Sequence, residues 1–145
     1  MLFIASDHAG IKIKQVATKY CKEHNIAFKD LGVHVSDSVD YPDMAEAVCQ
    51  EMLKDIENSR GILICGSGIG MSIAANRHRA IRAALCFDPY MAAFARKHNN
   101  ANVLCLGERV IGAGVAEAVI EVFLNETFEG GRHAIRVEKL TNTKD

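Results

Sequence analysis

Short apolar runs alternate with longer segments of helical period along most of the chain. Five of the runs have the length and the β-branched content of strands. The segments between them repeat their apolar residues at three- and four-residue steps, the pattern of a helix with one buried face. Repeated alternation of this kind is typical of a parallel sheet covered by helices. The predicted strands are residues 2–6, 26–31, 61–65, 81–86 and 102–106.

Several of the predicted helices have recognisable ends. One begins near Pro42, and the next follows Asp88, a suitable N-cap, with Pro89 at its first position and an end near Lys97. A further helix follows the last strand. In the helix that begins near Pro42, the apolar stripe is Ala45, Val48, Cys49, Met52 and Ile56. In the helix that follows the last strand, it is Val115, Val119 and Phe123.

These elements predict one α/β domain over residues 1–145, a three-layer Rossmann-like fold whose five-stranded parallel sheet has helices on both faces. A chain of 145 residues suits a single core, because folding at this size buries about 68–70% of the unfolded surface. The glycines of "EGG" at 129–131 break the chain before a short helical segment at 130–140. We expect this segment to contribute to the functional site.

Composition excludes several classes of protein. Hydrophobic residues make up 49% and charged residues 24%, with a net charge of −1, so neither disorder nor a nucleic-acid partner is expected. The longest apolar runs are far below the roughly 20 residues of a membrane span, and the first ten residues lack the pattern of a signal peptide. We therefore expect a cytoplasmic protein without membrane contact.

The five cysteines are odd in number and show no C-x-x-C spacing, which indicates neither a disulfide framework nor a zinc site. We expect reduced thiols that fill the core, and Cys65 alone has a position that also suits chemistry. The others are Cys21, Cys49, Cys86 and Cys105.

Polar residues follow the predicted strands. In an open parallel sheet, ligands bind beyond the carboxyl ends of the strands. Asp7 and His8 follow the first strand, "GSGIG" at 66–70 follows the third, "FDPY" at 87–90 follows the fourth, and "GER" at 107–109 follows the fifth. The sequence therefore predicts a site at this edge.

The glycine loop is the strongest local signal. Gly66, Gly68 and Gly70 let backbone N–H groups approach a ligand at the start of a helix, where negative charge is favoured. The loop matches neither nucleotide pattern, because a final small residue and a G-K-[ST] sequence are both missing. It predicts an anion or oxyanion site, with a plain tight turn as the alternative. Cys65 stands at its mouth, where helix N-termini favour the thiolate, although a buried structural cysteine is the alternative.

Histidine is the side chain best suited to proton transfer near neutral pH. His8 follows a strand and His98 lies in the irregular segment "KHNNAN", so both are candidates. His24 and His78 fall where helices should end, and His34 lies in a polar loop, so we expect these three to be solvated.

Two arginines predict a phosphorylated ligand. Arg132 and Arg136 stand four residues apart on one helix face, where like charges repel unless an anion compensates them. Arginine forks match phosphate geometry, and Arg109 adds a third. The alternative is a solvated basic face compensated by Glu129 and Glu138.

Long motifs carry a resemblance that covers essentially the whole chain. They occur in the same order as in the sugar-phosphate isomerase family that contains ribose-5-phosphate isomerase B, the RpiB/LacAB family, which this sequence resembles. The motifs are "SDHAG" at 6–10, "DYPD" at 40–43, "ILICGSGIGMSIAANR" at 62–77, "RKHNNANVLCLGER" at 96–109 and "EGGRHAIRV" at 129–137.

The resemblance implies interconversion of ribose 5-phosphate and ribulose 5-phosphate through an enediolate, with no metal and no organic cofactor. It implies that Cys65 is the base that moves the proton between C2 and C1, and that His98 opens the sugar ring. The resemblance also implies three groups of binding residues. The loop for the developing oxyanion is Gly66, Ser67, Gly68, Ile69 and Gly70. The contacts to sugar hydroxyls are Asp7, Tyr41 and Asn99, and the phosphate ligands are His8, Arg109, Arg132 and Arg136.

One branch of that family has a glutamate just after the glycine loop in place of the cysteine. Met71 stands there in this chain and cannot accept a proton, which leaves Cys65 as the base and Ser67 beside it in the catalytic loop. Two alternatives stay open: an isomerase for galactose 6-phosphate or allose 6-phosphate, and a regulator that binds a sugar phosphate without turnover.

The strand order along the chain also predicts a partner. Cys65 ends a strand at the carboxyl edge, whereas His98 precedes one and belongs near the amino edge. We therefore expect a homodimer, possibly paired again as a dimer of dimers, whose sites combine Cys65 of one chain with His98 and Asn99 of the other. The chain that supplies Arg109 stays undecided.

Overall fold

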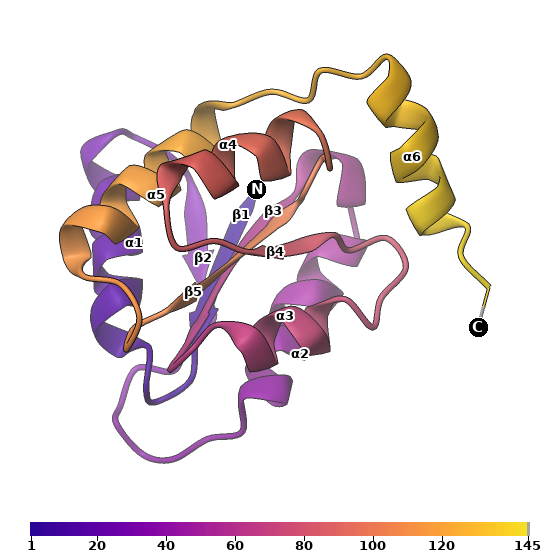
Figure 1. Ribbon diagram of the computed structural model, residues 1–145. Coiled ribbons are helices and arrows are strands. Elements are labelled where there is room, and N and C mark those ends of the chain that lie inside the picture. Colours follow the sequence, from indigo (N-terminus) through magenta and orange to yellow (C-terminus); the bar gives the residue numbers. More distant parts are fainter. Residues whose placement is uncertain (145) are drawn as a thin grey trace.

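The computed structural model describes residues 1–144 and confirms the parallel sheet (Figure 1). Within those residues the sheet has five strands in the order β2-β1-β3-β5-β4, and every neighbouring pair is parallel. The strands are β1 (Leu2–Ser6), β2 (Phe28–Asp30), β3 (Arg60–Cys65), β4 (Ala83–Leu85) and β5 (Val103–Gly107).

Helices cover both faces of the sheet and each face has its own apolar core. On one face α1 (Ile11–Glu23), α4 (Pro89–Lys97) and α5 (Ala113–Asn125) pack over the strands. On the other, α2 (Tyr41–Leu53) and α3 (Ile69–Ala75) do so. Apart from Arg60 at the start of β3, every residue of the three central strands is buried, as expected for a sheet packed on both sides.

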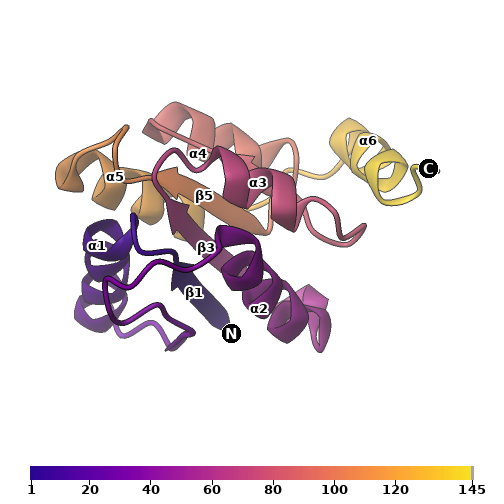
Figure 2. The same cartoon turned by 90° about the horizontal axis from the view of Figure 1, so that it is seen from below.

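The last helix, α6 (Arg132–Thr141), lies apart from these layers, as Figures 1 and 2 show. Of the residues in α6, only His133 is buried. The bounds of this helix agree with the predicted segment at 130–140 to within two residues.

Several predicted boundaries were wrong. The second and fourth strands are shorter than the ranges 26–31 and 81–86, because β2 and β4 are edge strands that pair on one side with only three registered residues each. The helix from Tyr41 ends at Leu53, and Ile56 begins a separate 3-10 helix (Ile56–Asn58), although its side chain still packs on the core.

The predicted stripe of α5 was wrong at Val115, which is exposed. The face turned to the sheet consists of Ala116, Val119, Ile120 and Phe123, and Val115 lies just outside the arc that these residues occupy around the helix. The predicted start of α4 is confirmed: the Asp88 carboxylate accepts a hydrogen bond of 2.8 Å from the N–H of Met91, and Pro89 is the first helical residue.

No helix formed by residues 1–144 has the length and apolar character that crossing a bilayer requires. The cytoplasmic location stays a prediction.

Candidate active site

Adjacent strand ends bring the predicted polar residues to one edge of the sheet. Cys65, the last residue of β3, is in register with Gly107, the last residue of β5. Backbone hydrogen bonds continue beyond the strands: the N–H of Asp7 donates to Ile64 over 3.1 Å, and that of Glu108 to Cys65 over 2.9 Å. The segments after β1, β3 and β5 therefore start side by side, as the sequence predicts.

The glycine loop between β3 and α3 depends on two glycines. Gly68 has φ +79°, a left-handed conformation that glycine adopts without strain. Gly107 lies so close to the loop that a Cβ there would be 2.5 Å from the carbonyl group of Ser67. The first N–H groups of α3 have no acceptor within their own helix, and those of Gly68 and Ile69 donate to Cys65 Sγ and Ser67 Oγ.

Cys65 lies directly beneath this loop. Its side chain is buried, and the Gly68 N–H donates to Sγ over 3.1 Å. A backbone donor aimed at sulfur stabilises negative charge on it. The thiol is thus placed at the end of a rigid strand, with a hydrogen-bond donor already facing it.

The other four cysteines are buried and free, as predicted. Burial raises the pKa of Cys21 and Cys49 to about 11 and that of Cys86 to about 12, and it raises the pKa of Cys105 well above its ordinary value. These thiols stay protonated at neutral pH and fill the core.

Other predicted residues surround the loop. The Ser67 hydroxyl accepts a hydrogen bond of 3.2 Å from the Ile69 N–H, which leaves its own proton available. The Tyr41 ring lies against Gly70, since a Cβ there would be 2.7 Å from Cε2 and Cζ of the ring. The guanidinium of Arg109 lies over Gly66, with Nη1 3.3 Å from the corresponding Cβ position.

Asp7 and His8 complete this edge. Asp7 is buried, and its Oδ1 accepts a hydrogen bond of 2.9 Å from the Ala9 N–H. His8 is exposed, and its Nδ1 accepts one of 3.2 Å from Val39, in the segment that leads to α2. The structure therefore gathers the predicted carbon base, the oxyanion loop and one set of polar contacts in a single chain.

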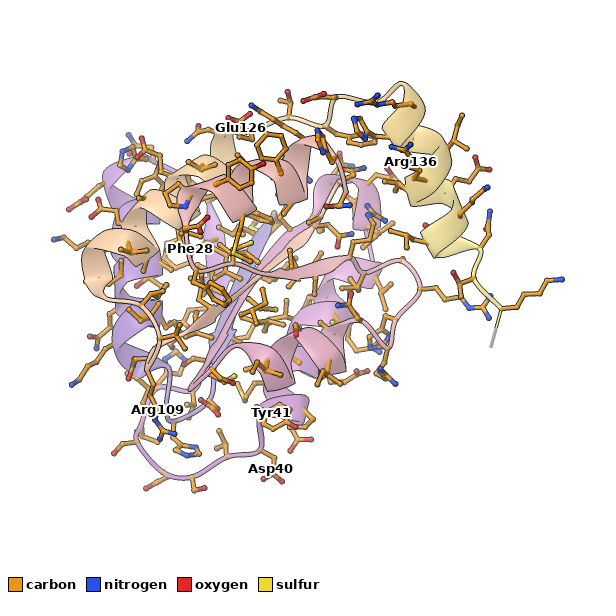
Figure 3. The ribbon with its side chains drawn as sticks, viewed as in Figure 1. Phe28, Asp40, Tyr41, Arg109, Glu126 and Arg136 are labelled. Carbon is orange, nitrogen blue, oxygen red and sulfur yellow. The ribbon has the colours of Figure 1, made fainter. Side chains whose placement is uncertain are left out.

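The remaining predicted residues lie at the opposite edge. Figure 3 shows Tyr41 and Arg109 at one end of the molecule and Arg136 at the other. His98 follows the last residue of α4 and shares a cavity of about 300 Å³ with Asn99 and Arg136. Arg132 begins α6 and is exposed. The structure brings His98 and Asn99 to the arginine helix and keeps them away from Cys65.

A stacked pair of imidazoles connects α4 to α6. The His98 and His133 rings lie 4.1 Å apart between centroids and 12° from parallel. The Nε2 atom of each lies 3.9 Å from a carboxylate oxygen of Glu129. Burial, followed by the charge of His98, lowers the pKa of His133. The neutral form of His133 is therefore favoured beside His98.

His98, Glu129 and His133 also offer three potential metal-ligand atoms within 4.8 Å of one another. A ligating imidazole directs its lone pair within the plane of its ring. Two nearly parallel rings do not point at one common position, so both histidines would bind one ion only after the rings splay apart.

The sequence analysis misses His133, and it gives Glu129 and Glu108 none of the contacts that they make here. His133 and Glu129 stand four residues apart, a spacing that predicts contact only if the helix extends across "GG". Glu108 was noted without a role, and its carboxylate accepts the N–H groups of Lys12 (2.7 Å) and Ile13 (3.0 Å) at the start of α1. A glutamate that caps a helix 95 residues earlier in the chain leaves no local sequence signal.

Comparison with known proteins identifies the family. Residues 2–140 match the Ribose/Galactose Isomerase family. The chain is 41% identical to ribose-5-phosphate isomerase B of Escherichia coli over 135 residues, 93% of this chain and 90% of that protein.

Two crystal structures of ribose 5-phosphate isomerase B share the fold. That of the Thermotoga maritima protein is 48% identical, with a TM-score of 0.94 over 98% of this chain and 97% of that one. The structure from Mycoplasma genitalium, solved with bound ribulose-5-phosphate, is 40% identical with a TM-score of 0.94 over 97% and 93%. The sequence resemblance is thus confirmed, and this chain belongs to the ribose/galactose isomerase family.

Proposed function

We propose that this protein interconverts ribose 5-phosphate and ribulose 5-phosphate through an enediolate. The observation that carries the proposal is the placement of the Cys65 sulfur beneath the glycine loop, with the Gly68 N–H 3.1 Å from it. The relatives named ribose-5-phosphate isomerase B, one of them with ribulose-5-phosphate bound, support this choice of substrate.

The proposed reaction starts from the open-chain aldose. The Cys65 thiolate removes the proton from C2, and the electron pair of that bond moves to form the C1–C2 double bond while the carbonyl oxygen on C1 becomes negative. The Cys65 thiol, whose proton can exchange with solvent, then delivers a proton to C1, the hydroxyl proton moves from O2 to O1, and the carbonyl reforms at C2. The step balances, because one proton leaves C2 and one is added to C1.

The loop N–H groups and Ser67 contribute by stabilising the negative oxygens. Donors that are already aimed at a developing oxyanion are a large catalytic contribution, and losing one costs about 2.7–4 kcal/mol. The phosphate, held by arginines away from the reacting carbons, converts binding energy into orientation.

We further propose that each site is shared between two chains. The carboxyl edge supplies Cys65 and the loop, and the amino edge of a second copy supplies His98, Asn99 and the arginines of α6. Each edge alone lacks one half of the predicted chemistry. A two-fold dimer makes two equivalent complete sites, and a pairing of such dimers stays possible within the same geometry.

A side-by-side assay tests the proposed substrate. The purified protein is offered ribose 5-phosphate, galactose 6-phosphate and allose 6-phosphate, and kcat/KM is measured for each. Because the additional hydroxylated carbon of a hexose must fit a site that positions five carbons, we expect kcat/KM to be about tenfold or more higher for the pentose. Preference for a hexose would replace the substrate and keep the mechanism, whereas binding without turnover of any of the three would contradict the isomerase.

A further inference from the structure

Three arginines converge on one cavity at the amino edge of the sheet. Arg60 is the first residue of β3, Arg82 directly precedes β4, and Arg96 lies in the last turn of α4. All three line a cavity of about 200 Å³. Cys65 ends β3 at the opposite edge, so this cavity is separate from the glycine loop.

These guanidiniums are partly buried and mutually repulsive: Arg60 and Arg82 are half-buried, and Arg96 is buried. Only 5% of Arg96 is exposed. Burial lowers the pKa of all three, that of Arg96 to about 10, and the charges of Arg60 and Arg82 contribute to that last shift. No carboxylate of residues 1–144 lies within 4.0 Å of any of them. Partly desolvated cations without a paired anion are less stable than fully solvated ones, and this holds most strongly for the buried Arg96.

Carbonyl groups and the Phe123 ring, which lies 6.0 Å from the Arg60 guanidinium and 5.8 Å from that of Arg96, compensate only part of this charge. Arg60 donates through Nη1, Arg82 through Nε, and Arg96 through Nε and Nη1. The Nη2 groups of all three form no hydrogen bond with the described part of the chain. Ser59, which lines the same cavity and is 6% exposed, also has a hydroxyl without a partner there.

We propose that this cavity binds one small tetrahedral oxyanion of the phosphate or sulfate class. Guanidinium forks match the oxygens of such an anion, and the Ser59 hydroxyl adds a neutral donor. A volume of about 200 Å³ holds roughly seven waters at about 30 Å³ each. That space accepts an inorganic oxyanion together with a few waters, and it is small for a sugar phosphate.

The site is connected to the segment that carries His98. Arg82 Nε donates to the carbonyl of Asn100 over 2.8 Å, and Arg96 Nη1 donates to its side chain over 3.1 Å. Asn100 has φ +47° and follows Asn99 directly. An anion that fixes these two guanidiniums therefore also fixes residues 98–100. This consequence rests on the proposed function of His98, whereas the binding site itself does not.

One acidic residue at the cavity offers a variant that should bind the anion more tightly. Glu57 lines the rim of the cavity and is exposed, and its charge acts on Arg82. A negative charge at the rim opposes entry of an anion. Glu57→Gln is therefore expected to tighten binding, while a substitution of any of the three arginines weakens it.

The experiment follows binding of inorganic phosphate by NMR at constant ionic strength, maintained with chloride. The signals observed are the arginine Nε–H groups and the backbone amides of residues 59–61 and 82–84. The chain carries Arg109→Ala, Arg132→Ala and Arg136→Ala, which removes the three arginines predicted to contact the sugar phosphate. We expect saturable shifts at Arg60, Arg82 and Arg96, with a Kd of about 1 mM or lower.

Matched variants locate the binding. Arg82→Gln, added to the same background, should weaken phosphate binding by about tenfold or more, because it removes a charge-assisted donor. Arg77→Gln removes a nearby exposed arginine that donates to its own helix and should change nothing, while Glu57→Gln should lower the Kd. Arg60→Gln replaces Arg82→Gln should the latter unfold.

Shifts that do not saturate, or that are equal with and without Arg82, would overturn the proposed anion site. Isomerase activity of the wild-type chain is measured separately, so failure of the anion site and failure of the proposed function are distinguishable.

Discussion

The shared site makes a prediction about mixtures of two inactive variants. Cys65→Ala removes the proposed base, and His98→Ala removes the group proposed to open the sugar ring. Each variant alone should be inactive toward the closed sugar. When their subunits exchange, a mixed dimer has one site with both lesions and one site with neither. Activity should therefore return upon mixing.

The structure supplies the reason that one chain cannot combine the two residues. The Gly61 N–H donates to the Asn102 carbonyl over 2.9 Å at the amino edge, and β3 then rises through four residues to Cys65, about 13 Å at 3.3 Å per residue. His98 precedes Asn102 on the amino-edge side. Direct proton transfer needs about 3 Å, so the thiol and the imidazole of one chain are too far apart to serve one sugar.

Equal amounts of the two variants, fully exchanged, give mixed dimers in about half of the population, so about a quarter of all sites are intact. The assay measures ribulose 5-phosphate formation after exchange in mild denaturant, with the mixed species verified by mass spectrometry of isotope-labelled chains. A mixture of Cys65→Ala with Cys65→Ser is the control and should stay inactive, because both lesions lie at the same edge. Persistent inactivity of the Cys65→Ala and His98→Ala mixture despite verified exchange would refute the shared site.

Four further predictions concern single residues. Cys65→Ala should abolish exchange of the C2 proton with solvent while phosphate still binds, and exchange at the wild-type rate would contradict its role as base. Arg136→Ala should raise KM and weaken inhibition by phosphate through loss of a contact of about 1.5–3 kcal/mol, whereas an unchanged KM with a lower Tm would make the residue structural. Gly107→Ala should displace the loop, because its Cβ would meet the Ser67 carbonyl at 2.5 Å, and it should lower kcat more than Gly112→Ala, whose Cβ meets nothing within 4 Å. Burial lowers the pKa of His133, so the unfolded chain binds its proton more readily and stability should fall as the pH drops below about 6.5; His133→Gln should flatten that part of the urea-midpoint profile, and equal profiles would contradict this assignment.

The central sheet and its carboxyl edge could be predicted because both depend on local signals. β1, β3 and β5 are buried on both faces, so their sequences are continuous apolar runs. Once the strands are parallel, the residues that follow them must lie at one edge. This is why Asp7, the glycine loop and Arg109 were placed together from sequence.

The errors fall where tertiary contacts decide the outcome. β2 and β4 are short because each is an edge strand with a neighbour on one side only. The sequence of neither strand shows that it lies at an edge. The α2 helix ends at Leu53, and a separate 3-10 turn places the Ile56 side chain against the core. The apolar spacing therefore continues beyond the end of the helix. The role of His133 required the knowledge that α6 returns to the end of α4.

The weak attachment of α6 gives a physical argument for the second chain. A helix of ten residues is marginal alone in water, and α6 buries only His133 within the described part of the chain. Its apolar residues Ile135 and Leu140 are 62% and 54% exposed, while Figure 2 shows the helix apart from the sheet. A helix of this kind is stable when another surface covers it. In the proposed dimer that surface is the carboxyl edge of the partner, so the contact that stabilises α6 is also the contact that brings its arginines to the sugar phosphate.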